Sequence, residues 1–266
     1  MSMEKNNSLE SSDLATPRYR LVFRHPDFLV VEKPAGLVVH PKENRPGEVP
    51  DFSNTLAGQL LEDFPSVGSV GEKVFRPGIV HRLDKETSGL MVVALNQTSF
   101  QFFKQAFSQR KMEKKYWALA WGEPKKESGE IRSLIGRSHN HPDRQAAVFS
   151  PAKAGNVKAA ASFFQVLKKQ SGMSLWEVAP QTGRKHQIRV HLHLMGHPVV
   201  GDKKYQTKTL KKKNVLFGRH FLHAFFLRFV FSDGKEYSFK SDWPPDFQAV
   251  FPLDPRSGFG LTGGDF

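Results

Sequence analysis

Residues 79–95 read Ile-Val-His-Arg-Leu-Asp-Lys-Glu-Thr-Ser-Gly-Leu-Met-Val-Val-Ala-Leu. The charged first half of this stretch contains Asp84 and leads directly into an apolar segment, Leu90–Leu95, whose pattern is typical of a buried strand. The cations beside Asp84 favour the ionised form of its carboxyl group. An ionised carboxylate on a loop that a rigid sheet holds in place is suited to nucleophilic or general-base chemistry. These residues alone leave a second interpretation open, in which Asp84 caps a turn and pairs with Arg82 or Lys85.

The composition describes a chain with enough apolar material for a substantial core. Its 266 residues suit one large domain or two small ones, and 39% hydrophobic residues with 23 phenylalanines supply that core. There is no cysteine, which excludes disulfides, thiolate metal sites and a cysteine nucleophile. The first 18 residues lack the apolar segment of a signal peptide, and no apolar run approaches membrane-spanning length. We therefore expect a soluble, cytoplasmic protein.

The charge is strongly positive. A formal net charge of +13 and a pI near 9.9 favour a polyanionic partner, because each phosphate contact releases counterions. No basic amphipathic helix of the membrane-surface type stands out, so a nucleic acid is the expected partner. A basic patch follows the polar segment 181–198, and its members either contact phosphate or face solvent: Lys203, Lys204, Lys208, Lys211, Lys212 and Lys213.

Strand-like segments outnumber helical ones and come as hairpins. The expected strands are Tyr19–Phe23, Phe28–Glu32, Leu37–His40, Lys114–Gly122, Lys158–Leu167, Ser174–Ala179, Leu222–Phe231 and Lys235–Phe239. The expected helices are Leu56–Leu61 and a segment capped by Asn96 or Thr98 that carries Phe102, Phe103, Ala106 and Phe107 on one face. Residues 41–54 and 136–157 are predicted to be polar loops. The pattern predicts an α+β fold with a large mixed, mainly antiparallel sheet flanked by helices and loops.

The predicted domain organisation is simple. Residues 19–255 form a single catalytic domain, residues 1–18 a flexible N-terminal tail and residues 256–266 a Gly-rich C-terminal tail. No composition break separates two independent domains.

The segment 181–198 is the densest polar stretch, and its pattern is ambiguous. Apolar residues alternate from Ile188 to Leu194 as in a strand, yet Thr182 can N-cap and Gly196 can C-cap a helix. Its four histidines invite a metal site, but Gly196 and Pro198 end the helix before His193 and His197 could share an ion, and no HExxH pattern is present. We therefore expect no metal.

Two further side chains are candidates for a site. Arg189 is flanked by apolar residues, and a part-buried guanidinium needs a carboxylate, for which Asp84 is a candidate; a solvated arginine is the alternative. Tyr116 can stack on a base and transfer a proton, although a half-buried strand tyrosine is the commoner fate of such a residue.

Four segments together resemble the RluA-type pseudouridine synthase family. His81–Leu90 is similar to the family's signature, Pro34–Pro41 to its first motif and Lys115–Ala118 to its tyrosine motif. Thr182–Leu192 with Gly196–Asp202 is similar to its third motif, and the resemblance runs from about Tyr19 to Phe251. It favours a helix at 184–195 and implies the pseudouridine synthase fold. Many relatives carry an N-terminal S4 RNA-binding domain, for which residues 1–18 are too short.

The resemblance implies a reaction and roles for its residues. Uridine in rRNA or tRNA is flipped out and isomerised to pseudouridine, without metal or cofactor. The oligomeric state is not indicated, and a monomer is the default expectation. Asp84 is then the catalytic carboxylate, Tyr116 stacks on the uracil, and Arg189 keeps Asp84 ionised, with Arg184 as a second candidate. The expected RNA-binding residues, of which the lysines follow from the charge of the chain, are His81, Arg82, Arg184, Lys203, Lys211, Lys212 and Lys213.

Several questions stay open at this level. Asp84 attacks C1′, adds to C6 or assists formation of a glycal, and the RNA and the uridine are not specified. The alternative functions are a catalytically silent RNA-binding or ribosome-assembly protein on the same fold and a metal-dependent hydrolase built on the histidines.

Overall fold

The computed structural model describes residues 17–42, 48–138, 141–148 and 157–254. The tails expected at residues 1–18 and 256–266 lie outside these ranges except for residues 17 and 18, and so do parts of the loops expected at 41–54 and 136–157. Within the described ranges, no helix is long and apolar enough to cross a membrane.

The described residues form ten strands, five α-helices and one 3-10 helix, η1 (Pro65–Ser69). The strands are β1 (Arg20–Arg24), β2 (Phe28–Lys33), β3 (Ser88–Ala94), β4 (Glu113–Trp121), β5 (Ser128–Arg137), β6 (Gln145–Val148), β7 (Lys158–Gln170), β8 (Met173–Pro180), β9 (Leu222–Val230) and β10 (Glu236–Lys240). The α-helices are α1 (Leu56–Asp63), α2 (Gln97–Ser108), α3 (Gln187–Leu194), α4 (Lys208–Asn214) and α5 (Pro245–Val250).

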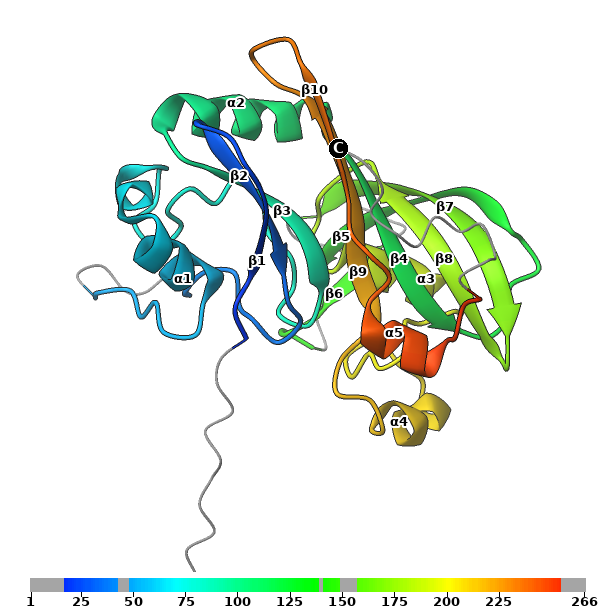
Figure 1. Cartoon of the computed structure of the whole chain (residues 1–266). Coiled ribbons are helices and arrows are strands. Elements are labelled where there is room, and N and C mark those ends of the chain that lie inside the picture. Colours follow the sequence, from blue (N-terminus) through cyan, green and yellow to red (C-terminus); the bar gives the residue numbers. More distant parts are fainter. Residues whose placement is uncertain (1–16, 43–47, 139–140, 149–156, 255–266) are drawn as a thin grey trace, which may run out of the picture.

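All ten strands belong to one sheet, in the order β1-β2-β3-β9-β4-β8-β7-β5-β6, with β10 paired to β9 (Figure 1). Only the pairing of β3 with β9 is parallel among the described strands, and the other pairings are antiparallel. The predicted α+β fold with a mainly antiparallel sheet is confirmed. Helices α1 and α2 lie beside β1–β3, and α3 packs against β5–β8.

The parallel pairing of β3 with β9 brings the two backbones very close. A Cβ atom on Gly89 would lie 2.2 Å from the Ala224 carbonyl oxygen, and the φ of Gly89 is +117°. Only glycine fits such a contact and such a backbone angle. The end of the Asp84 loop is therefore fixed directly to the centre of the sheet.

Within segment 181–198, residues Gln187–Leu194 form the helix α3, inside the range 184–195 that the resemblance favoured. Gly196 has a φ of +82°, and the His197 N–H donates to the Leu192 carbonyl, which is the Schellman ending. The expected N-cap was wrong: His186 occupies that position with a φ of 58°. The Thr182 hydroxyl instead donates to the Gln187 side chain, which keeps the approach to the helix folded against β7.

The strand expected at Leu37–His40 does not form. Only Val38 makes an isolated bridge, to Thr55. The Val38 and Val39 carbonyls accept the N–H groups of Leu56 and Ala57, so they pair with the first turn of α1 rather than with a neighbouring strand.

The loop expected at 136–157 is partly a strand. β6 pairs with β5 antiparallel and lies at the edge of the sheet. Because an edge strand is half exposed, its sequence lacks the apolar run that marks a central strand, and composition alone suggests a loop.

The other expected elements are in place. α1 covers Leu56–Asp63, and Asn96 caps α2 through a reciprocal capping box with Ser99. The hairpins turn at Ser171-Gly172 and Asp233-Gly234, where positive φ angles of 53°, 71° and 80° occur at Ser171, Gly172 and Gly234. Most phenylalanines pack in the core, as in the cluster around Phe28, Phe103 and Phe229.

Candidate active site

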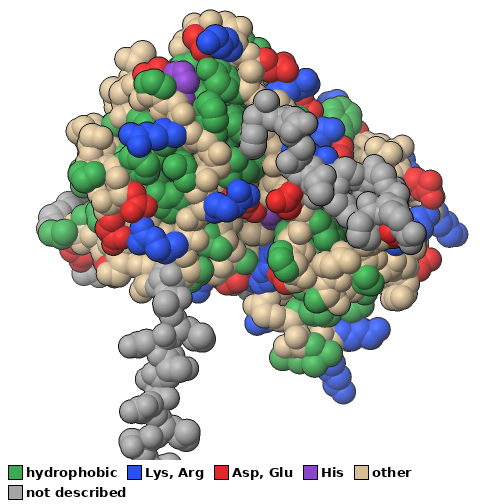
Figure 2. Space-filling view, viewed as in Figure 1, with side chains coloured by type: hydrophobic (Ala, Val, Ile, Leu, Met, Phe, Trp, Pro, Cys, Tyr) green, Lys and Arg blue, Asp and Glu red, His purple; other side chains and the backbone are tan. Residues whose placement is uncertain are grey.

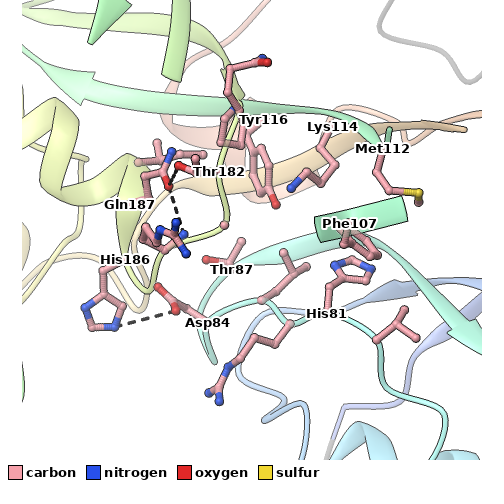
Figure 3. A pocket seen from close by; sticks show the side chains of 18 of the residues that line it. His81, Asp84, Thr87, Phe107, Met112, Lys114, Tyr116, Thr182, His186 and Gln187 are labelled. Atoms are coloured by element: carbon pink, nitrogen blue, oxygen red, sulfur yellow. Dashed lines mark hydrogen bonds and ion pairs between the residues drawn. The ribbon is translucent and has the colours of Figure 1, made fainter. Parts of the chain in front are cut away.

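The described part of the chain forms a cavity of about 700 Å³. Three parts of the fold line it: the loop before β3, the segment from the end of α2 into β4, and the segment that leads into α3 (Figure 3). The cavity therefore lies where the two halves of the sheet meet, and Asp84, Tyr116 and Arg189 all line it although they are far apart in sequence.

Hydrogen bonds from the end of β2 and the turn after it hold the loop that carries Asp84. The Gly36 N–H and the Lys33 ammonium both donate to the Lys85 carbonyl, at 2.9 and 3.0 Å. Lys33 is fully buried and also donates to the carbonyls of Pro34 and Leu37, while burial lowers its pKa to about 7. This lysine joins the turn after β2 to the loop that carries Asp84, which limits how far Asp84 can move.

Asp84 makes an ion pair with Arg189. The Arg189 Nη1 donates to Asp84 Oδ2 at 2.8 Å, and the Asp84 side chain is 22% exposed. The interpretation that Asp84 pairs with Arg82 or Lys85 is not the arrangement observed, because Arg82 donates to His40 Nε2 at 3.0 Å and the Lys85 carbonyl, not its side chain, anchors the loop.

A second carboxylate, Asp202, holds the same guanidinium from behind. Arg189 Nε donates to Asp202 Oδ2 at 2.6 Å and Nη2 to Oδ1 at 3.0 Å, and the Asp202 side chain is fully buried. Asp202 Oδ1 also accepts the backbone N–H groups of Lys204 and Tyr205. Sequence reasoning did not assign Asp202 to Arg189, although Asp202 ends the third motif.

The electrostatics keep Asp84 charged. Burial opposes ionisation, but His186 and Arg189 together hold the pKa of Asp84 below its usual value. Burial also lowers the pKa of His186 to about 4, so this ring is neutral near pH 7 and Arg189 is the cation that acts there. His186 Nε2 lies 3.8 Å from Asp84 Oδ1, and its Nδ1 hydrogen-bonds the Tyr205 hydroxyl at 2.8 Å.

Tyr116 projects from β4 into the cavity (Figure 3). Burial raises the pKa of its phenol, and the negative charge of Asp84 raises it further. The hydroxyl therefore stays protonated at neutral pH. The ring offers a flat surface to a planar guest beside the Asp84 carboxylate.

The other predicted site residues have different surroundings. His81 lines the cavity, and its Nε2 accepts a hydrogen bond from the Val92 N–H while its ring packs against Phe107. Burial lowers the pKa of His81 to about 3, so its ring is neutral near pH 7. Arg82 is exposed at the mouth. Arg184 also lines the cavity, where its Nε donates to the Ala159 carbonyl.

The lysines of the basic patch are not brought to the cavity. Lys203 is exposed and is not among the lining residues. Lys211, Lys212 and Lys213 lie exposed on α4, whose cationic side chains gather at the lower edge of the molecule (Figure 2).

The four histidines of segment 181–198 are dispersed. His191 lies buried between the Ser133 and Ser162 hydroxyls, and His197 contacts the Trp121 carbonyl. The described residues contain no group of three or more side chains placed to hold a metal ion.

Comparison with known proteins gives consistent findings. Residues 27–194 match the RNA pseudouridylate synthase family. The chain is 37% identical over 244 residues to an uncharacterised RNA pseudouridine synthase of Chlorobaculum parvum, covering 86% of this chain and 72% of that protein. It is 33% identical over 238 residues to ribosomal large subunit pseudouridine synthase D of Zymomonas mobilis, covering 88% and 72%. The solved structure of human RNA pseudouridylate synthase domain containing 1 superposes with a TM-score of 0.70 at 28% identity, covering 89% of this chain and 87% of that one.

Proposed function

Because this chain belongs to the RNA pseudouridylate synthase family and is an isomerase of that class, we propose that it isomerises a uridine of ribosomal or transfer RNA at Asp84. The relative named for the large ribosomal subunit makes ribosomal RNA the first substrate to test. The observation that carries the proposal is the Asp84–Arg189 ion pair inside a cavity that Tyr116 also lines.

The cavity suits an extruded nucleotide. A uracil within a stacked RNA cannot reach Asp84, so the nucleotide must swing out at a cost of a few kcal/mol. Cations around the cavity can contact the neighbouring phosphates and offset that cost: Arg76, Arg82, Arg110, Lys111 and Arg184. The Tyr116 ring then supports one face of the flipped base.

The reaction balances without an added reagent. The bond between C1′ and N1 breaks and its electron pair leaves with the uracil, the base turns, C5 bonds to C1′, and the C5 proton is lost while N1 gains one. Three routes use Asp84 differently: attack on C1′, addition to C6, or removal of a ribose proton to give a glycal. All three begin from an ionised carboxylate, which Arg189 favours.

The rival function is an RNA-binding or ribosome-assembly protein without catalysis. Release of tritium from RNA labelled at C5 of uridine separates the two, because isomerisation frees the C5 hydrogen and binding does not. Ribosomal and transfer RNA from cells that lack the gene serve as substrates. We expect release by the wild type and none by Asp84→Asn, with RNA affinity retained.

Glu72→Gln is the matched control, since Glu72 is an exposed carboxylate that pairs with Lys104. It should release tritium at the wild-type rate. A wild type that binds these RNAs tightly but frees no tritium from any of them would favour the silent binding protein.

A further inference from the structure

Lys114 is a cation of the cavity that has no polar partner among the described residues. Lys114 lines the cavity from β4, and among the described residues its ammonium makes neither a hydrogen bond nor an ion pair. Its Nζ lies over the Phe107 ring, 5.4 Å from the ring centroid. Burial lowers the pKa of Lys114 to about 8, which leaves the group mostly charged near pH 7. A half-buried ammonium with only a ring contact lacks the hydrogen bonds that usually offset the burial of a charge, so it is available to a polar group of the substrate.

Arg76 also lines the cavity half-buried, with its guanidinium over the Phe75 ring and its Nε without a hydrogen-bond partner among the described residues. The remaining cations of the cavity have polar partners or are exposed. Arg189 is bound to two carboxylates, Arg82 to His40, and Arg184 to a carbonyl. Arg110 and Lys111 also line the cavity, but their side chains are exposed and are hydrated by solvent. Lys114 and Arg76 are both half-buried, and of the two only Lys114 lies on β4, the strand that carries Tyr116.

Lys114 also lies beside the surface that receives the base. It precedes Tyr116 by two residues on β4, and both side chains enter the same cavity (Figure 3). Burial raises the pKa of the Tyr116 phenol, and the charge of Asp84 raises it further, whereas burial lowers the pKa of Lys114.

The chemistry of the proposed reaction produces an anion at this place. When the C1′–N1 bond breaks, uracil departs with the electron pair, and the negative charge spreads over N1 and the O2 and O4 carbonyl oxygens. A fixed cation beside a charge that develops during reaction lowers the barrier, most strongly where water is excluded. The base then turns and re-bonds through C5, after which the charge is gone.

We propose that the Lys114 ammonium donates to a carbonyl oxygen of the flipped uracil and stabilises the negative charge that the base gains as its glycosidic bond breaks. This role rests on the proposed function and adds a substrate-contacting residue to it. A phosphate of the RNA backbone is the competing ligand for the same ammonium.

The test compares Lys114→Met, Lys114→Arg and the control Lys115→Met. Lys115 is adjacent on β4 but pairs with Glu177 at 3.1 Å and does not line the cavity. Single-turnover tritium release at saturating enzyme gives the chemical rate, and RNA affinity is measured across a series of salt concentrations. Lys114→Met should lose about 100-fold in the single-turnover rate, in the range found for removal of one such donor. Its affinity should stay within about twofold of the wild type, Lys114→Arg should recover much of the rate, and Lys115→Met should match the wild type.

The contrary results are distinct. If Lys114 binds phosphate, Lys114→Met should lower the RNA affinity, reduce the salt slope by about one unit and leave the single-turnover rate at saturating enzyme unchanged. That result would overturn the proposal. A Lys114→Met rate equal to that of the wild type would overturn it as well. A wild type that is inactive on every RNA overturns the proposed function and this inference together, whereas an active wild type isolates the result at Lys114.

Discussion

Asp202 holds Arg189 by two hydrogen bonds, from Nε at 2.6 Å and from Nη2 at 3.0 Å, and leaves Nη1 to reach Asp84. A guanidinium is planar, so fixing two of its nitrogens fixes the direction of the third. The exposed fractions of the two carboxylates also differ: the Asp202 side chain is fully buried and the Asp84 side chain is 22% exposed. The buried acid orients the cation, and the accessible acid faces the cavity.

Asp202→Asn should destabilise the protein and misplace Arg189. The variant keeps the shape of the side chain but removes the charge opposite a buried guanidinium, and breaking such a pair costs about 3–5 kcal/mol. Chemical denaturation measures the loss of unfolding free energy. Asp143→Asn is the control, because Asp143 pairs with Lys204 at the surface and is 62% exposed, where an ion pair is worth about 0–1 kcal/mol. Equal stability of the two variants would contradict the orienting role of Asp202.

Tyr116→Phe and Tyr116→Ala should separate the hydroxyl from the ring. The raised pKa of the Tyr116 phenol rules out a resting phenolate near neutral pH, so its hydroxyl acts through a hydrogen bond or by transferring a proton during reaction. Tyr116→Phe should lower the single-turnover rate by about 10²- to 10⁴-fold if the hydroxyl transfers a proton. Tyr116→Ala should in addition lose about 1–3 kcal/mol of stacking on the base. A wild-type rate in Tyr116→Phe would restrict Tyr116 to stacking.

The protein should lose stability as the pH falls below about 6.5, the pKa of an unperturbed histidine. Burial lowers the pKa of six histidines to about 3 or 4: His40, His81, His186, His191, His220 and His223. Between pH 6.5 and about pH 3–4 the unfolded chain binds protons at these histidines, whereas the folded chain does not. The contribution of the neutral histidines to the unfolding free energy is therefore complete above pH 6.5 and is lost toward pH 3–4. Each such histidine adds up to about 1.4 kcal/mol per pH unit to the slope.

His223→Gln tests this pH dependence at one position. His223 is buried between the Ser88 and Ser241 hydroxyls, at 2.8 and 3.0 Å. In denaturation experiments at a series of pH values, the unfolding free energy of the variant should fall less between pH 6.5 and 4 than that of the wild type. The slopes of unfolding free energy against pH should differ by at most the contribution of one bound proton. His141→Gln, at an exposed position, should keep the wild-type slope. A slope unchanged in His223→Gln would show that this ring is protonated in the folded protein.

The sequence was informative where one local pattern determines one element. The α2 helix has a capping residue at Asn96 and an apolar face, the hairpin turn at Ser171-Gly172 has residues that tolerate positive φ, and β3 has an unbroken apolar run. The motifs also gave the family, which the match over residues 27–194 confirms. These features depend on neighbours in the chain, so a single sequence contains them.

The elements and contacts that sequence reasoning missed depend on distant partners. Leu37–His40 resembles a strand, but its carbonyls are bound by the start of α1. Asp202 lies 13 residues beyond Arg189, and only the turn after α3 brings its carboxylate back to the guanidinium. Lys114 is one of two adjacent lysines, and the sequence does not indicate which one faces the cavity. The pleat and a register shift at Lys115 and Tyr116 decide this.

Neutralising the lysines of α4 should weaken RNA binding without slowing the chemistry. Lys211, Lys212 and Lys213 are exposed on a helix that does not line the cavity, next to the exposed apolar side chains of Val215 and Leu216. If they contact phosphate, a triple change to Met should reduce the salt dependence of binding by up to about one slope unit per lost contact. The single-turnover rate at saturating enzyme should match the wild type, because no group near Asp84 changes. Lys125→Met with Lys126→Met, at exposed positions after β4, is the control. An unchanged slope in the α4 variant would mean that these lysines face solvent in the complex. The RNA would then contact the cations that line the cavity instead of those on α4.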